Sequence, residues 1–263
     1  MVTIIMPVSR DMYLPKVFHS LENLIVDKAN TNLFVYVDGN WRLFEKTRNL
    51  VLNSKFAEKL CVYGQLPGSI ANGVRQRRRR IANIHNEIIQ NLKESAQDDE
   101  LVFLLEDDTV IKPSTIQKLT QTLTTDRNIG FVTGVEIGRW GYEHVGAWRV
   151  DNVYDIQSVR STPLEDGIQK IDAAGIYCTL MKKRVYMQHT FKPFEDALGP
   201  DFDMGIELRK MGYSNYIDFS VTCEHLTPKG SITVQNSTIV EIGLTRDSSS
   251  KNGWRTQVIN KGS

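Results

Sequence analysis

Residues 101–108 read LVFLLEDD, five apolar residues followed directly by three carboxylic acids. A short apolar run is typical of a strand that is buried on both faces, as in a parallel sheet covered by helices. Ligands of open α/β sheets bind outside the carboxyl ends of the strands, where these acids lie. Adjacent carboxylates repel one another unless a cation neutralises them, and oxygen ligands suit Mg²⁺ or Mn²⁺ better than Zn²⁺. The stretch predicts a buried strand that ends at a divalent-cation site, with an acidic surface turn as the alternative.

Strand and helix patterns alternate along the rest of the chain. Strands are expected at residues 3–8, 33–37, 60–63, 101–105, 131–133, 176–181, 216–221 and 239–244. Helices are expected from Pro15, over 71–95, after Pro113 and over 204–211. The long helix would bury a face formed by Ile81, Ile84, Ile88 and Leu92. This order predicts an α/β fold with a mostly parallel sheet, flanked by helices and joined by right-handed crossovers.

Composition and charge are those of an ordinary globular protein. The 263 residues are 41% hydrophobic and 24% charged, which excludes a disordered chain. The 32 basic residues nearly balance the 31 acidic ones, so the net charge of +1 gives no overall preference for nucleic acid or membrane. No stretch approaches the roughly 18 consecutive apolar residues of a membrane span. Three scattered cysteines and an apolar start without a basic leader favour a cytoplasmic protein.

Five motifs follow one another along roughly residues 1–228. They are Ile4–Val8, Val35–Gly39, Arg80–Asn83, Leu105–Asp108, and an acidic segment from Gly199 to Asp203 that His225 follows. In this order and with these separations, the chain resembles a GT-A glycosyltransferase of the family-2-like kind. The resemblance implies the GT-A fold, a Rossmann-like nucleotide-diphospho-sugar transferase architecture. It also implies a catalytic domain over 1–229, with a nucleotide-binding half over 1–110 and an acceptor-binding half over 111–229, and a C-terminal extension over 230–263.

The resemblance further implies roles for individual residues. The donor would contact Pro7, Val8, Ser9, Arg10, Asp38, Arg80, Asn83, Glu106 and Asp107. A divalent cation, Mn²⁺ or Mg²⁺, would bind Asp108 and His225, as in the metal-binding DxD motif of the family. The acceptor would contact Trp140, Trp148 and Arg209. The usual acidic motif has Glu-Asp where this chain has Pro200-Asp201, so Asp201 and Asp203 are both candidates for the catalytic base.

Together these features predict a metal-dependent glycosyltransferase that uses a nucleotide-diphosphate sugar. A UDP-sugar is favoured because the Asp38 carboxylate can accept a hydrogen bond from the imide N–H of uracil, although guanine offers a similar edge. A base on the opposite face of the sugar would give inversion at the anomeric carbon. The hydroxyl acceptor would be a glycan or a modified nucleobase of phage-type DNA.

Two other classes of protein remain open. A sugar-phosphate nucleotidylyltransferase shares the general fold and use of metal, but it would normally carry a Gly- and Arg-rich loop after the first strand, where residues 9–12 read SRDM. A non-catalytic nucleic-acid-binding module would use the five arginines between Arg75 and Arg80, and would not need the acids or His225. The chain has no P-loop, and no GxGxxG follows its first strand, which excludes the ATPase and dehydrogenase classes.

Overall fold

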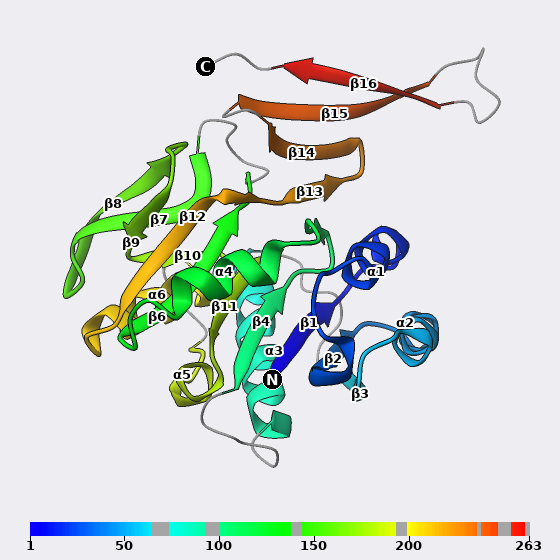
Figure 1. Ribbon diagram of the computed structural model, residues 1–263, viewed down its shortest axis with the longest axis horizontal. Helices are drawn as coiled ribbons and strands as arrows, with labels where there is room; N and C mark the ends of the chain where they lie inside the picture. Colours follow the sequence, from blue (N-terminus) through cyan, green and yellow to red (C-terminus); the bar gives the residue numbers. More distant parts are fainter. Residues whose placement is uncertain are drawn as a thin grey trace.

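The computed structural model describes residues 1–64, 74–92, 100–137, 144–192, 199–235, 238–246 and 254–260 (Figure 1). Within this part of the chain, the central sheet has eight strands in the order β3-β2-β1-β4-β11-β6-β12-β9. Their bounds are β1 (Val2–Val8), β2 (Thr31–Asp38), β3 (Lys59–Gly64), β4 (Leu101–Leu105), β6 (Ile129–Val135), β9 (Ile168–Ile171), β11 (Cys178–Lys182) and β12 (Ser214–Thr222).

Most of this sheet is parallel. Strand β1 pairs in parallel with β2 and β4, β2 with β3, and β6 with β12, whereas β11 and β9 run antiparallel to their neighbours. The predicted fold class is therefore confirmed, and the segment expected at 176–181 is the antiparallel strand inserted in the middle. Because β2, β1 and β4 are parallel neighbours, the residues that follow them meet at one edge of the sheet.

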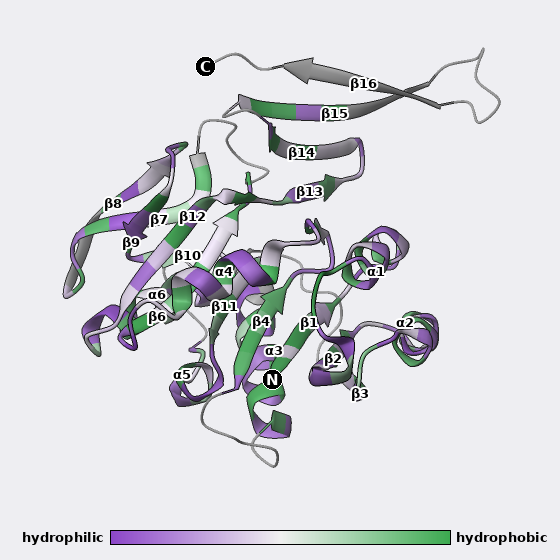
Figure 2. Ribbon diagram, viewed as in Figure 1, coloured by the Kyte–Doolittle hydropathy of each residue, from purple (hydrophilic) through white to green (hydrophobic). Residues whose placement is uncertain are grey.

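Helices cover both faces of the sheet. They are α1 (Leu14–Glu22), α2 (Trp41–Asn53), α3 (Val74–Leu92), α4 (Thr115–Leu123), α5 (Lys183–Gln188) and α6 (Pro200–Lys210), with a 3₁₀ turn, η1 (Lys28–Asn30). In β4, Phe103 and Leu105 pack into a core with α1, α2 and α4, whereas Val102 and Leu104 pack into a second core with α3, α5 and α6. Successive strand residues face opposite sides, so an unbroken apolar run supplies both cores. Figure 2 shows this hydrophobic character along β1 and β4.

Two smaller sheets complete the described structure. One has the order β10-β7-β8 and contains β7 (His144–Asn152), β8 (Asp155–Pro163) and β10 (Ala173–Ala174). The other is antiparallel, with the order β16-β15-β14-β13-β5, and contains β5 (Thr109–Val110), β13 (Glu224–Thr227), β14 (Gly230–Gln235), β15 (Thr238–Arg246) and β16 (Trp254–Asn260). The predicted boundary at 229/230 falls between β13 and β14, which are hydrogen-bonded neighbours. The C-terminal segment therefore continues a sheet that begins directly after Asp108, and the division into domains stays a prediction.

Three sequence predictions about the elements need adjustment. Ile81 is 37% exposed rather than buried, although Ala82, Ile84 and His85 beside it on α3 are buried. The helix expected from residue 204 begins at Pro200, whose fixed φ suits the first helical turn. No strand was expected between residues 133 and 176, where β7, β8, β9 and β10 lie. None of the described helices has the length and apolar character needed to cross a membrane.

Candidate active site

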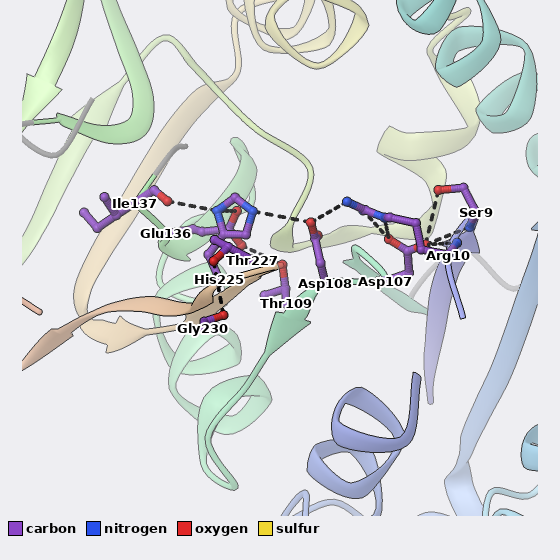
Figure 3. Close-up of polar contacts among 10 residues, drawn as sticks. All are labelled: Ser9, Arg10, Asp107, Asp108, Thr109, Glu136, Ile137, His225, Thr227 and Gly230. Carbon is purple, nitrogen blue, oxygen red and sulfur yellow. Dashed lines mark hydrogen bonds and ion pairs between the residues drawn. The ribbon is translucent and has the colours of Figure 1, made fainter. Parts of the chain in front are cut away.

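The candidate site lies where β1 and β4 end and where the antiparallel sheet begins. Ser9 and Arg10 follow β1, and the three acids follow β4. Strand β5 begins at Thr109 and pairs with β13, which places His225 directly opposite Thr109. Figure 3 shows Arg10 and His225 approaching Asp108 from opposite sides. Residues more than 100 positions apart in the sequence are thereby brought onto one carboxylate.

Asp107 holds the loop after β1. Its Oδ2 accepts hydrogen bonds from the backbone N–H groups of Ser9 and Arg10 at 2.7 and 2.9 Å, and from the Ser9 hydroxyl at 3.3 Å. Its Oδ1 accepts from Arg10 Nε at 3.0 Å and from Arg10 Nη2. The carboxylate is 3% exposed. Asp107 positions Ser9 and Arg10 in this arrangement, and its contact with the donor stays a prediction.

Asp108 lies between two basic side chains. Its Oδ2 accepts a hydrogen bond from Arg10 Nη1 at 2.7 Å and lies 3.3 Å from His225 Nε2. On the other side of the ring, His225 Nδ1 lies 2.9 Å from the Ile137 carbonyl oxygen and 3.3 Å from Glu136 Oε1. Burial alone would lower the pKa of His225, but the hydrogen bond to Asp108 and the nearby carboxylates raise it to about 9.

The donor set suits a divalent cation held jointly with a substrate. The contact with the Ile137 carbonyl orients the imidazole so that Nε2 points at Asp108, the arrangement in which a histidine binds a metal through Nε2. In the described part of the chain, no group of three or more His, Cys, Asp and Glu side chains is arranged to hold a metal ion. Asp108 and His225 would thus supply two ligands. Mg²⁺ and Mn²⁺ commonly take one or two protein ligands and complete their shell with water and substrate phosphates.

Asp38 and Arg80, both predicted to contact the donor, bind each other. Arg80 Nη2 donates to Asp38 Oδ1 at 2.6 Å, and Arg80 Nε donates to the other oxygen, which makes a bidentate pair. Asp38 ends β2 and is 6% exposed. Hydrogen bonding to Asp38 raises the pKa of Arg80. The structure therefore brings these two residues together at the sheet edge, with Arg80 orienting the Asp38 carboxylate.

The other residues predicted to contact the donor differ in how much of each is exposed to solvent. Val8 is 1% exposed and packs in the core, so only its backbone can reach a ligand. Pro7 is partly buried within β1, and Ser9 is exposed just beyond it. Asn83 is exposed on α3, and Glu106 is exposed after β4.

The two candidate bases stand in different surroundings at the start of α6. A Cβ placed on Gly199 or on Gly175 would lie 2.5 or 3.7 Å from a carboxylate oxygen of Asp201, so this carboxyl group lies over the backbone before β11. That segment reaches the acidic cluster, because the Glu106 N–H donates to the Tyr177 carbonyl at 3.3 Å. Burial raises the pKa of Asp201, whereas backbone hydrogen bonds and the charge of Arg78 lower it. Asp201 therefore lies against the backbone segment that contacts Glu106.

Asp203 is more deeply buried. Its side chain is 5% exposed, and Oδ2 has no hydrogen-bond partner among the described residues. Burial and the charge of Glu207 raise the pKa of Asp203 to about 6, although Lys192 and Lys210 oppose the change. Helix residues that are two positions apart point about 200° apart around the helix axis. Asp201 and Asp203 therefore cannot face the same ligand.

The predicted acceptor residues are placed differently from one another. Arg209 donates to Asp172 Oδ1 at 2.8 Å and to the Tyr213 carbonyl at 3.0 Å, a role in holding α6. Trp148 is partly buried and packs edge-on against Phe202, with ring centroids 5.9 Å apart. Trp140 lies outside the described residues.

The arginine run does not form one surface. Arg80 binds Asp38, Arg79 is exposed, and Arg78 is partly buried with its charge near Asp201. The side chains of Arg75 and Arg77 lie outside what the structure describes.

Sequence reasoning missed Glu136. This residue is 5% exposed, contacts His225 and accepts a hydrogen bond from the Thr109 hydroxyl at 2.6 Å. A signal was present, because Glu136 directly follows the apolar strand β6 just as the acidic cluster follows β4. The double contact of Arg10 had no comparable signal in the sequence.

Comparisons with known proteins agree with this architecture. A family model, glycosyltransferase like family 2, matches residues 68–238. A search of curated proteins finds no match. The mannosyltransferase PcManGT from Pyrobaculum calidifontis, solved in complex with GDP-Man and Mn²⁺, is similar with a TM-score of 0.59 and 14% identity. The alignment covers 87% of this chain and 58% of that protein, so the chain spans less than two thirds of its length. Protein A197 from STIV gives a TM-score of 0.47 and 13% identity over 100% of this chain and 94% of that one.

Proposed function

The chain belongs to the glycosyltransferase-like family 2, and from this premise we propose that it transfers a sugar from a nucleotide-diphosphate sugar to a hydroxyl acceptor. The observation that carries the proposal is the convergence of Asp108 and His225, 3.3 Å apart, at the sheet edge that Asp38 also reaches. The GDP-Man and Mn²⁺ of the Pyrobaculum mannosyltransferase support a nucleotide-sugar donor and a divalent cation.

The donor's base is recognised by Asp38 in this proposal. The bidentate contact with Arg80 fixes the plane of the carboxylate, so that one oxygen can accept a hydrogen bond from an imide N–H. This hydrogen bond fits uracil and favours a UDP-sugar, while guanine is the second candidate. Ser9 and Arg10, which Asp107 positions, follow the neighbouring strand β1 and would meet the diphosphate. Residues 1–110 then form the donor half of the domain.

Asp108 and His225 are the proposed ligands of the cation. Mn²⁺ or Mg²⁺ bound there would act as a Lewis acid that stabilises the departing nucleoside diphosphate. Asp108 supplies the charged oxygen, and the contact of His225 with the Ile137 carbonyl keeps the imidazole aimed at it. Glu136 lies on the other side of the ring, 3.3 Å from Nδ1, and helps to fix its orientation.

The acceptor hydroxyl loses its proton to Asp201. A carboxylate accepts this proton well when its pKa is raised toward neutrality, and burial acts on Asp201 in that direction. Asp201 also lies against the backbone segment that contacts Glu106, whereas Asp203 is buried near Glu207. Attack from the side of Asp201, opposite the leaving group, would invert the anomeric carbon. Glycan hydroxyls and hydroxylated nucleobases are the acceptors to compare.

The test is release of nucleoside diphosphate from a panel of UDP- and GDP-sugars, with Mn²⁺ or with EDTA, and with each acceptor class. We expect turnover with a cognate donor only in Mn²⁺ or Mg²⁺, and its loss in Asp108→Asn. Asp151→Asn is the matched control, because Asp151 is exposed and pairs with Arg160 far along β7 and β8. Donor hydrolysis or transfer that is unaffected by EDTA would contradict the metal-dependent reaction.

A further inference from the structure

A positive side chain of this chain already pairs with two of the carboxylates after β4, Asp107 and Asp108. Arg10 spans both acids, with Nε 3.0 Å from Asp107 Oδ1 and Nη1 2.7 Å from Asp108 Oδ2 (Figure 3). The Arg10 side chain is 33% exposed, whereas that of Asp108 is 1% exposed. Arg10 therefore occupies the carboxylate oxygen of Asp108 that also faces His225, and its own side chain is partly buried.

Arg10 has an anchor that does not depend on Asp108. Two of its guanidinium nitrogens, Nε and Nη2, bind Asp107, and its backbone N–H donates to the same carboxylate at 2.9 Å. Only Nη1 reaches Asp108. Loss of the Nη1 contact would release Asp108 and leave the contacts with Asp107 in place. The contact of Arg10 with Asp108 can thus break while its contacts with Asp107 remain.

A divalent cation on Asp108 would lie within a few ångströms of this guanidinium. Like charges at such a distance repel strongly where the site is shielded from water, as the burial of Asp108 indicates. A diphosphate changes the balance, because its negative charges attract both the cation and the guanidinium, and arginine binds phosphate oxygens well.

We propose that Arg10 couples metal binding to donor binding. In the free protein the contact of Arg10 with Asp108 competes with the binding of a divalent cation. When a nucleoside diphosphate binds Arg10 Nη1, this contact breaks and the Asp108 carboxylate becomes available to the cation. The inference rests on the proposed function for the assignment of Asp108 and His225 as cation ligands. Coupling of this kind is reciprocal, so the cation should strengthen nucleotide binding by the same factor.

The experiment measures Mn²⁺ affinity from the electron paramagnetic resonance signal of free Mn²⁺, with metal-free protein, with and without UDP or GDP. Titrations of nucleotide without protein supply the correction for Mn²⁺ that the nucleotide binds itself. In the wild-type protein we expect nucleotide to tighten Mn²⁺ binding by about tenfold or more. In Arg10→Gln, Mn²⁺ binding without nucleotide should tighten by about tenfold, and the effect of nucleotide should shrink.

Two further variants separate coupling from a general charge effect. Arg149→Gln is the matched control, because Arg149 also forms a bidentate pair, with Glu165 at 3.0 and 2.9 Å, but on β7. Its Mn²⁺ affinity should equal that of the wild type. Arg10→Lys keeps the charge but cannot bridge two carboxylates, so its Mn²⁺ affinity without nucleotide should exceed that of the wild type. This variant carries the test if Arg10→Gln does not fold.

The outcomes also separate this inference from the proposed function. If the folded Arg10 variants bind Mn²⁺ no more tightly than the wild type without nucleotide, the coupling by Arg10 is overturned, while Mn²⁺-dependent transfer stands. If the Arg149→Gln control tightens Mn²⁺ binding equally, the effect belongs to net charge and the inference also fails. If the wild type binds no Mn²⁺ even with nucleotide, the proposed metal site fails and the coupling fails with it.

Discussion

Replacing Asp203 with asparagine should stabilise the folded protein at neutral pH. Asp203 is 5% exposed, and burial raises its pKa from the ordinary value of 3.8 to about 6. The folded protein therefore holds a carboxylate in a place that favours the neutral acid. Raising the pKa over this interval corresponds to about 3 kcal/mol at a pH above both values. Asparagine has nearly the same shape and no charge, so it removes this cost.

The sign of the pH dependence follows from the two pKa values. Between pH 3.8 and about 6 the unfolded chain releases the Asp203 proton while the folded protein keeps it, so this group lowers stability as the pH rises. Below pH 3.8 both states are protonated, and the advantage of asparagine disappears. A buried amide that lacks partners costs about 1–2 kcal/mol of the gain. The expected net stabilisation of Asp203→Asn at pH 7 is therefore about 1–2 kcal/mol.

Urea unfolding of the wild type and Asp203→Asn at pH 4, 5, 6, 7 and 8 measures this difference. The gap in free energy of unfolding should open between pH 4 and 6 and stay constant above pH 7. Asp151→Asn removes the same charge from an exposed position and should leave the gap near zero throughout. A gap that is independent of pH, or a destabilised Asp203→Asn at pH 7, would show that the carboxylate has a stabilising partner and would refute the reasoning.

Four other predictions concern the site. Asp108→Asn should abolish Mn²⁺-dependent turnover with an unchanged circular dichroism spectrum, and full activity of this variant in EDTA would contradict this. Asp38→Ala should weaken nucleotide binding by about 1–3 kcal/mol in calorimetry, because it removes a charged hydrogen-bond acceptor. Asp201→Asn should lower kcat by at least about 10²-fold with donor affinity retained, and Asp203→Asn should lower it less; the reverse order would make Asp203 the base. Gly199→Ala should lower the thermal unfolding temperature, because Gly199 has a φ of +133° and a Cβ there would lie 2.5 Å from a carboxylate oxygen of Asp201.

Structure could be predicted from the sequence where an apolar run is directly followed by polar residues. The pattern at 101–108 predicts β4, its burial on both faces and the acids at its carboxyl end, and the structure has all three. Such a pattern is local, since it depends on a few consecutive residues and on the period of a strand. The position of Asp38 could be predicted for the same reason. Asp38 ends β2, an apolar strand that is separated from β4 only by β1, so it lies at the same edge of the sheet.

Contacts across the chain could not be predicted in this way. The bond between Arg80 and Asp38 and the role of Arg209 in holding Asp172 depend on how α3 and α6 pack on the sheet, which no spacing of residues specifies. The buried face of α3 also holds His85, which lies beside Tyr186 with Nδ1 2.9 Å from the hydroxyl oxygen. A polar residue in a core becomes predictable only when its partner is known.

The antiparallel sheet explains why His225 can belong to a site built on parallel strands. Loops after parallel strands deliver side chains to one edge, but each loop reaches only its own strand and near neighbours. Strand β5 leaves the central sheet directly after Asp108, and β13 pairs with it so that His225 faces Thr109. The opposite edge of β13 pairs with β14, where Ile232 lies across from His225 and is 3% exposed. The position of the imidazole is thus fixed from both sides by backbone pairing, and the segment after residue 229 supports the geometry of the candidate metal pair.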